Sequence, residues 1–311
     1  MVARVAEEWL NSCSGCEISL VDLGERILDV LRLVEFVHMP VLMDHKYFGQ
    51  LGDGARIDIP EADVGIITGG LRNEEHLEVA RVMRERCGLI IALGTCATHG
   101  GIPALVNSFT NEAVLERCYS TETTDAGQPR PKEGLPPLLD AVYALDEKIK
   151  VDVYLPGCPP HPDQVFDLLT GLLTGGPVSL SEKSVCDFCP TVRKGKGQVK
   201  RLRRFLQAPE WGAPGEPLDK TRCLLEQGFL CMGPVTRGGC GGGLLVPRCL
   251  KAGVPCRGCS GPVSHDGNQL LQMLNALASN GIELDSLPDY PSLLRFSGSH
   301  ALLRPAQSVR K

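Results

Sequence analysis

The sequence has no long hydrophobic segment. Its longest apolar stretches, such as residues 88–94, are far shorter than the roughly 20 residues that a helix needs to cross a bilayer. The first residues, MVARVAEEWLNSC, contain no basic region, no apolar core and no twin arginine, so we expect no export signal. We therefore predict a cytoplasmic protein with no membrane span.

Nucleotide-binding motifs are absent too. No GxGxxG follows the first predicted strand and no Walker sequence occurs, which leaves no basis for a dinucleotide or nucleoside triphosphate site. A flavin is not excluded by a sheet of the predicted type, although cysteines occupy the loops that it would need.

Excess positive charge is also lacking. The net charge is −5, and we predict no nucleic-acid partner. Segment 193–204 carries seven Lys or Arg, but without aromatic interleaving or a basic background. We interpret it first as a solvated surface and second as a docking surface for an acidic redox partner.

Cysteine, by contrast, is abundant, with 14 residues. Disulfides suit small secreted domains, whereas thiols in a chain without an export signal stay reduced, so metal or cluster binding is the favoured interpretation. Eight cysteines fall between Cys186 and Cys259, in a stretch of Gly, Pro and Arg that is poor in large apolar side chains. We expect an inorganic group to hold this stretch together.

Residues 1–178 alternate short apolar segments with helical patterns, which predicts an α/β region with a parallel sheet covered on both faces. The predicted strands, each followed by a turn or a Gly/Pro-rich segment, are Ala3–Leu10, Val34–Met39, Val64–Thr68, Leu89–Leu93 and Val151–Leu155.

Three helices are predicted between these strands. Asn73 caps one of them, with Glu74 and Glu75 in its first turn. Another starts near Cys16 and places on one side Ile18, Val21, Ile27, Leu28 and Leu31. The third is predicted from a repeat at three and four residues, formed by Leu138, Leu139, Val142, Leu145 and Ile149.

Four cysteines directly follow strands of the predicted sheet. Cys13 and Cys16 follow the first strand, Cys96 the fourth and Cys158 the fifth. Because open parallel sheets bind ligands at the carboxyl ends of their strands, we expect four thiolates to converge there. Four cysteines fit a [4Fe–4S] cluster. The alternative is structural zinc, which usually takes two close pairs from local hairpins.

The eight remaining clustered cysteines divide into two fours by order and spacing. The ferredoxin run CxxCxxCxxxC is absent, so this is not a simple two-cluster ferredoxin insert. One predicted set is Cys186, Cys189, Cys223 and Cys231, and the other is Cys240, Cys249, Cys256 and Cys259.

Five further residues call for an interpretation. Cys87 and Cys118 are expected to pack in the core, where free cysteines are common. His99 and His161 lie beside predicted ligands, and we expect them to pack or to form hydrogen bonds, because four thiolates already fill the site. Glu17 lies in the first turn after Cys16, where the helix dipole favours an acid, and it is a candidate proton carrier.

Taken in order, the motifs CSGCE, GTCATHGGIP, PGCPP, CxxC and CMGPVTRGGCG resemble the small subunit of a [NiFe] hydrogenase over nearly the whole chain. WLNSCSGCEISLVDLGE and VHMPVLMDHKY most resemble the cytoplasmic group, in particular the F420-non-reducing (methyl-viologen-reducing) type that works with heterodisulfide reductase in methanogens.

This resemblance implies a flavodoxin-like domain over residues 1–178, an irregular, cysteine-rich iron–sulfur domain over 179–282 and a C-terminal tail over 283–311. It also implies three [4Fe–4S] clusters. The proximal site would be Cys13, Cys16, Cys96 and Cys158, the medial site Cys240, Cys249, Cys256 and Cys259, and the distal site Cys186, Cys189, Cys223 and Cys231.

Two positions separate this chain from the periplasmic relatives, which have a histidine in place of Cys186 and a proline in place of Cys249. Since both are cysteine here, the resemblance implies no [3Fe–4S] cluster. The extra thiolate at the medial site should favour a lower reduction potential, because it adds ligand charge.

The resemblance further implies the partners. The nickel–iron centre would lie in a separate large subunit, with no catalytic residue in this chain, and electrons would pass from the proximal to the distal site. They would leave toward an iron–sulfur adaptor and heterodisulfide reductase.

Several alternatives stay open. An F420-reducing or NADP-linked hydrogenase would use another acceptor, and a quinone-reductase subunit of this type would lack the eight-cysteine extension. Outside electron transfer, a zinc protein with four-cysteine sites would be colourless, and a nucleic-acid-binding module would show salt-dependent binding.

Overall fold

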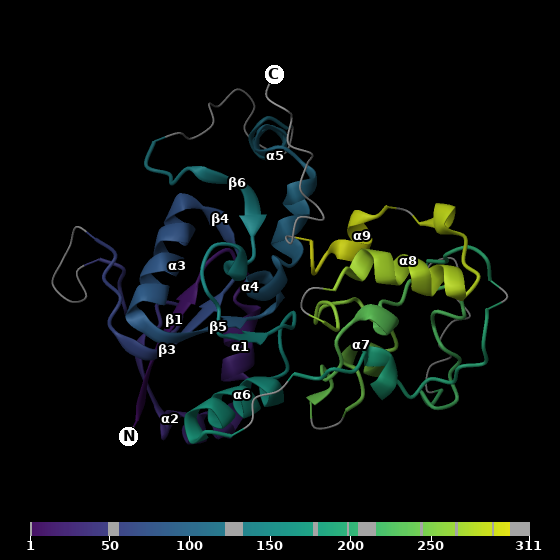
Figure 1. Ribbon diagram of the computed structural model, residues 1–311, viewed down its shortest axis with the longest axis horizontal. Coiled ribbons are helices and arrows are strands. Elements are labelled where there is room, and N and C mark those ends of the chain that lie inside the picture. The colour runs from purple at the N-terminus through teal and green to yellow at the C-terminus, as the bar shows by residue number, and fades with distance from the viewer. Residues whose placement is uncertain are drawn as a thin grey trace.

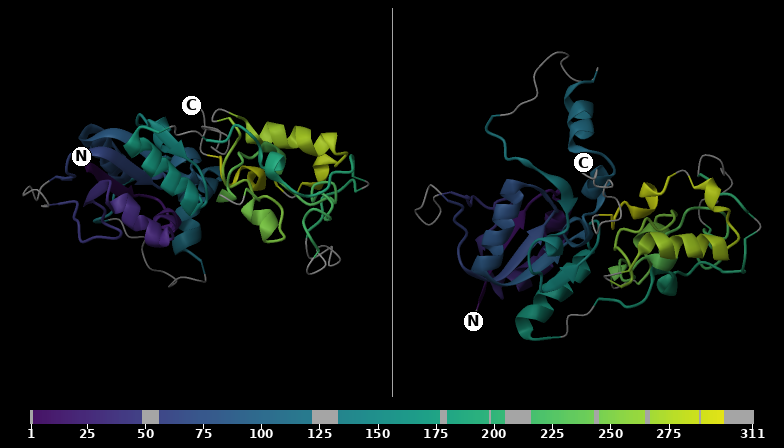
Figure 2. Two further views of the ribbon diagram at one scale, coloured as in Figure 1. Left: turned by 90° about the horizontal axis from the view of Figure 1, so that it is seen from below. Right: turned by 45° about the horizontal axis from the view of Figure 1, so that its top comes forward.

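The computed structural model describes residues 2–48, 56–121, 133–176, 180–197, 199–204, 216–242, 245–264, 267–287 and 289–298. They form two regions that lie side by side, an α/β region on the left of Figure 1 and an irregular region on the right. Both further views keep this arrangement (Figure 2).

Five parallel strands form the main sheet in the order β2-β1-β3-β5-β7. Numbered along the chain, this is the 2-1-3-4-5 order of flavodoxin-like folds, so the predicted fold class is confirmed. The strands are β1 (Ala3–Trp9), β2 (Val34–His38), β3 (Ala62–Thr68), β5 (Cys87–Leu93) and β7 (Val153–Leu155). Each of the five predicted strands is found, with ends that shift by at most two residues.

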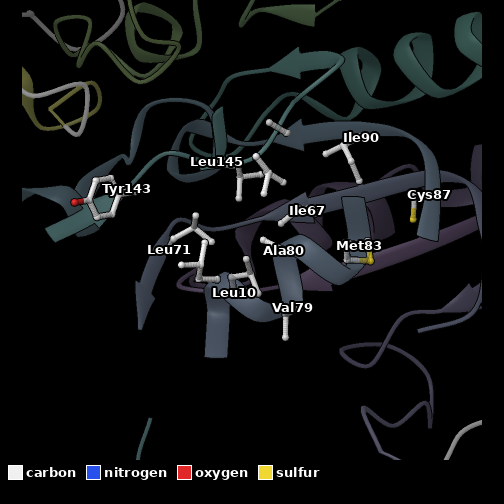
Figure 3. Close-up of a cluster of buried hydrophobic side chains, with 14 of the residues drawn as sticks. Leu10, Ile67, Leu71, Val79, Ala80, Met83, Cys87, Ile90, Tyr143 and Leu145 are labelled. Carbon is white, nitrogen blue, oxygen red and sulfur yellow. The ribbon is translucent and has the colours of Figure 1, made fainter. Parts of the chain in front are cut away.

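Helices cover both faces of this sheet, as Figure 1 shows. On one face, buried side chains of α1 (Gly15–Val21), α2 (Ile27–Leu31) and α6 (Pro162–Thr174) pack on the strands. On the other, α3 (Glu74–Arg86) packs through Ala80 and Met83 toward Ile67 and Ile90, as Figure 3 shows. Two buried faces explain why the strands are nearly continuous apolar runs.

The predicted N-terminal cap of α3 is confirmed, because the Asn73 side chain accepts a 2.8 Å hydrogen bond from the His76 backbone N–H. The cap satisfies one of the backbone donors that the first turn of a helix leaves open.

The helix predicted from Leu138 to Ile149 is wrong. Residues Leu138–Tyr143 form strand β6, which pairs antiparallel with β4 (Leu71–Asn73), and the 3₁₀ turn Leu145–Glu147 follows. Leu139, Ala141 and Tyr143 alternate toward one hydrophobic cluster. The helical period and the strand period both fit this short apolar run, and pairing with β4 selects the strand.

The apolar side predicted for the helix after Cys16 is also wrong. The helix α1 ends at Val21, and a 3₁₀ turn at Gly24–Arg26 leads into α2. This turn begins at Gly24, whose φ is 59°. Leu20 and Leu23 are the buried residues. Four of the five residues predicted to share the apolar side are exposed, namely Ile18, Val21, Leu28 and Leu31.

The second region contains little regular structure. Its helices are α7 (Arg248–Lys251), α8 (Gln269–Ser279) and α9 (Pro291–Leu294), with 3₁₀ turns at Val185–Phe188, Gly233–Val235 and Leu284–Ser286. A small core gathers around Phe229, Met273 and Leu277, and the buried Leu293 of α9 joins it. Part of the segment predicted as a tail is therefore packed against α8.

The remaining helices link the strands of the first region. They are α4 (Thr95–His99), the 3₁₀ helix Ile102–Ser108 and α5 (Asn111–Tyr119). No side chain of α5 is buried, and the helix stands away from the sheet in the right view of Figure 2. Within the described ranges, no helix has the length and apolar character required to cross a bilayer.

Candidate functional site

Four predicted cysteines meet at the carboxyl edge of the sheet. Cys13 precedes α1 and Cys16 lies in it, Cys96 lies in α4 directly after β5, and Cys158 follows β7. Burial, followed by the charges of Glu17, Cys96, Cys158 and Cys13, raises the pKa of Cys16 well above its usual range. The four predicted thiols thus lie close enough to act on one another electrostatically.

The backbone makes room around these sulfurs. A Cβ added at Gly101 would lie 2.8 Å from the Cys96 Sγ, and one at Gly94 would collide with the Cys16 Sγ. Between the first two cysteines, Ser14 adopts a left-handed conformation with φ of 63°, which non-glycine residues rarely do. Such strain concentrates at functional sites.

The cysteines of the distal site line one cavity of about 370 Å³, formed between the 3₁₀ turn Val185–Phe188 and the end of α8. Its walls include Cys186, Cys189, Cys223 and Cys231. Burial and then the neighbouring Cys231 raise the pKa of Cys186 to about 12. At the start of α8, the Asn268 side chain accepts a 2.9 Å hydrogen bond from the Leu271 backbone N–H and caps the helix.

The cysteines of the medial site lie between the other two sets. Burial raises the pKa of Cys259 to about 12, with further contributions from the charges of Cys240 and Cys249. The pKa of Cys256 is raised by burial and then by the charge of Cys231, with smaller effects of Cys259 and Cys249. Cys256 and Cys231 are adjacent across the predicted boundary, and the division of the eight cysteines into these two sets stays a prediction.

Hydrogen bonds between cysteines connect the three sites. The Cys158 backbone N–H donates to the Cys259 sulfur, from the proximal to the medial site. The Cys256 backbone N–H donates to the Cys231 sulfur, from the medial to the distal site. The three predicted sets thus adjoin one another, the first through Cys158 and Cys259 and the second through Cys256 and Cys231.

Each of the three predicted sets offers four thiol donors. Among the described residues, which include all twelve cysteines, no three Cys, His, Asp or Glu side chains could hold one metal ion. A zinc ion needs its sulfur ligands at about 2.3 Å, whereas four cysteines hold a whole [4Fe–4S] cluster. Each predicted set of four thiols matches the donor set of a [4Fe–4S] cluster.

Other hydrogen bonds reach the sulfurs from within each site. The Thr191 Oγ1 lies 2.9 Å from the Cys189 Sγ. Backbone N–H groups of Gly233, Gly258 and Ile102 donate to Cys231, Cys256 and Cys96, respectively. Sequence reasoning missed Thr191. Its position two residues after Cys189 was the only signal that could have identified it.

Three acidic residues near the proximal site are buried: Glu7, Glu8 and Glu17. Glu17 accepts a 2.5 Å hydrogen bond from the Thr68 Oγ1. Burial and then the charges of Glu17 and Glu8 raise the pKa of Glu7 well above its usual value. Sequence reasoning found Glu17 but missed Glu7, because acids in a strand pattern usually face water.

The remaining interpretations have mixed outcomes. Cys87 is buried as predicted, whereas Cys118 is exposed because α5 buries none of its side chains, so its core assignment is wrong. His161 accepts a hydrogen bond from the Asp163 N–H at 3.2 Å, and the His99 Nδ1 lies 2.7 Å from the Thr98 Oγ1. Both histidines thus form the hydrogen bonds expected of them.

Comparison with known proteins agrees with this geometry. Residues 13–172 match the family described as NADH ubiquinone oxidoreductase, 20 kDa subunit. One subunit of the vhu F420-non-reducing hydrogenase of Methanocaldococcus jannaschii is 38% identical, and the match covers 97% of each chain. The iron-sulfur subunit of the F420-non-reducing hydrogenase of Archaeoglobus profundus is 36% identical over 90% of this chain and 88% of its own.

A solved structure is also similar. In an NAD⁺-reducing [NiFe] hydrogenase in the H2-reduced state, one chain superposes with a TM-score of 0.52 at 33% identity. The match covers 58% of this chain and 95% of that one. Together with the five-stranded sheet and the ordered cysteines, these matches show that the chain belongs to the family of [NiFe] hydrogenase small subunits, alongside the corresponding subunits of F420-non-reducing hydrogenases.

Proposed function

We propose that this small subunit carries three [4Fe–4S] clusters and conducts electrons from H2 oxidation at the large subunit through the proximal, medial and distal sites. The observation that carries the proposal is the order of three four-cysteine sets joined by the Cys158–Cys259 and Cys256–Cys231 hydrogen bonds. When bound, each cluster would supply a one-electron carrier.

The chain's own contribution is to hold and tune these carriers. Buried thiols with raised pKa values, such as Cys96 at about 12, are protonated at neutral pH, so cluster assembly must displace their protons. Hydrogen bonds donated to sulfur then stabilise the reduced state. The chain provides neither a nickel site nor a catalytic residue in this proposal.

The proximal site faces the large subunit in this proposal. Cys13 is exposed, and the neighbouring helices expose Ile18, Val21, Leu28 and Leu31, which we call the α1–α2 apolar surface. Contiguous exposed apolar groups mark protein interfaces. Ile18→Asp should therefore weaken binding of the large subunit in co-purification, whereas Val2→Asp, at another exposed apolar residue, should leave it intact.

The electron acceptor is an acidic iron–sulfur adaptor that passes electrons to heterodisulfide reductase. Beside Cys256, the medial ligand that adjoins Cys231 of the distal site, lies a cavity of about 200 Å³, which we call the arginine pocket because its lining includes Arg203, Arg204, Arg257 and Arg295. Positive charge near a cluster ligand suits a negatively charged redox partner, and such complementarity mainly raises the association rate.

One preparation tests the core of the proposal. The small and large subunits, matured together and purified without oxygen, should contain about twelve irons per small subunit beyond those of the large subunit. H2 should bleach their visible absorption and produce the EPR signals of reduced [4Fe–4S] clusters. Zinc in place of iron, or a markedly lower iron content after full maturation, would contradict it.

The acceptor is tested separately. Subunits that co-purify from the native source should include an iron–sulfur adaptor and heterodisulfide reductase, and Arg257→Glu should slow adaptor reduction in a salt-dependent way. Copurification of an F420- or NADP-reducing subunit instead would leave the relay standing but replace this acceptor. The predicted cytoplasmic location belongs to the same proposal.

A further inference from the structure

We propose that Thr95 is a positioning residue that holds the proximal and medial sites at a fixed separation and so sets the rate of electron transfer between them. This inference rests on the relay proposed above. It concerns a residue that holds no cluster and touches neither partner surface described for the relay.

Thr95 is buried at the start of α4, between Gly94 and the ligand Cys96, with 1% of its surface exposed. Its backbone N–H donates to the Gly157 carbonyl at 2.9 Å, and its hydroxyl accepts from the Gly157 N–H at 2.8 Å. The same hydroxyl donates to the Cys259 carbonyl in a short hydrogen bond. Since a backbone N–H only donates and a carbonyl only accepts, the roles of the hydroxyl are fixed.

These contacts hold Cys259 at two points. The Thr95 hydroxyl binds its carbonyl, and the Cys158 N–H, one residue after Gly157, binds its sulfur. The proximal loops thus hold the backbone and the ligand atom of one medial cysteine. Removing the hydroxyl would leave the Gly157 N–H and the Cys259 carbonyl without this buried partner, which is unfavourable because buried polar groups need hydrogen-bond partners.

The second junction is built differently. There the Met232 N–H donates to the Cys256 carbonyl at 3.0 Å while the Cys256 N–H donates to the Cys231 sulfur. Both donors are backbone N–H groups within one region, and no side chain other than that of Cys231 takes part. The first junction crosses between the α/β region and the irregular region, and it depends on the Thr95 side chain.

The step itself is simple to balance. With clusters bound, one electron would pass from the proximal to the medial site, while no covalent bond changes and no proton moves. H2 oxidation at the large subunit supplies two electrons per molecule. Because electron tunnelling falls steeply with separation, a small opening of this junction slows the step while the driving force stays the same.

The test uses the complete complex with Thr95→Val, Thr95→Ser and the matched control Thr98→Val. Thr98 is a buried threonine of the same helix, and its hydroxyl bonds to Gly94 and His99 rather than to the cysteine-rich region. Freeze-quench EPR after mixing with H2 follows reduction of each site, and redox titration gives their potentials. Iron content and H/D exchange at the large subunit serve as integrity measurements.

We expect Thr95→Val to slow medial reduction relative to the unsubstituted complex, with unchanged iron content, site potentials and H/D exchange. Thr95→Ser should restore the rate and Thr98→Val should keep it. A wild-type rate in Thr95→Val, loss of iron from that variant, or an equal slowing in Thr98→Val would overturn the inference. Failure of the relay itself would be recognised independently, since the unsubstituted complex would then lack three reducible clusters.

Discussion

In the α/β region, five parallel strands are covered by two clusters of buried side chains, whereas in the cysteine-rich region a single smaller cluster surrounds α8 and most of the backbone forms short turns. The first region holds four of the twelve predicted ligands and the second holds eight. Apolar burial alone accounts for the sheet, while the turns around the medial and distal sites depend on bound metal in our proposal.

The largest expected effect is on folding. Iron removal should unfold residues 180–287 and leave the sheet in place, because metal-binding free energy is folding free energy where the apolar core is small. Hydrogen exchange followed by mass spectrometry should show lost protection around Cys223–Cys259 and retained protection in β1, β3 and β5. Simultaneous loss of protection in both regions would end this distinction between them.

Substitution of one predicted ligand should distinguish the site where electrons enter from the site where they leave. Cys189→Ser should cut reduction of the physiological acceptor at least roughly tenfold, since loss of groups that merely support metal ligands already costs that much. H/D exchange at the large subunit should persist, because the proximal site is intact.

Cys118→Ser is the matched control, since Cys118 is exposed and lies outside the three sites. An equal collapse of H/D exchange in an intact Cys189→Ser complex would show that the distal site is not the exit.

The two regions should also differ in their response to pH after metal removal. Burial raises the pKa of Cys96 to about 12 and that of Cys16 still further, from an ordinary value of 9.0. The folded sheet therefore binds protons more tightly than the unfolded chain, and this stabilisation is complete below about pH 9 and is lost as the pH rises toward 12.

Urea titration of the metal-free protein at pH 7 and pH 10 should show the unfolding midpoint of the sheet falling. Cys96→Ala should reduce that slope, whereas Cys118→Ala should not. An unchanged slope in Cys96→Ala would mean that the thiol is not buried in the folded sheet.

The smallest effect concerns the potential of the distal site. With Cys189 bound to iron as a thiolate, the Thr191 hydroxyl is the donor in their 2.9 Å contact, and this bond stabilises the extra charge of reduction. Thr191→Val should lower the potential by about 60 mV, since a hydrogen bond to a charged group contributes about 1.5 kcal/mol and 59 mV corresponds to a tenfold change for one electron.

An EPR-monitored redox titration of the distal site would detect this shift, and Thr191→Ser should abolish it. A shift confined to the proximal site would contradict the assignment of Thr191 to the exit.

Sequence reasoning succeeded where a pattern has a single physical meaning. Each apolar strand run ended at a Gly- or Pro-rich turn, and each predicted strand was found. The Asn73 cap followed from the side-chain chemistry of helix starts. It failed where two structures fit one pattern, as at Leu138–Tyr143, where pairing with β4 decided for a strand. The prediction that Cys118 packs in the core also failed, because no local signal indicates that α5 lies on the surface.

The amino-acid sequence by itself determined the parallel sheet, the α/β order and the grouping of cysteines along the chain, because these depend on local periodicity and on residues close in sequence. Only the tertiary structure decided that Cys158 would touch Cys259, that Cys256 would touch Cys231 and that Thr95 would join two regions. Such contacts link residues up to 164 positions apart, and their formation depends on how complete surfaces pack rather than on any local preference of the chain.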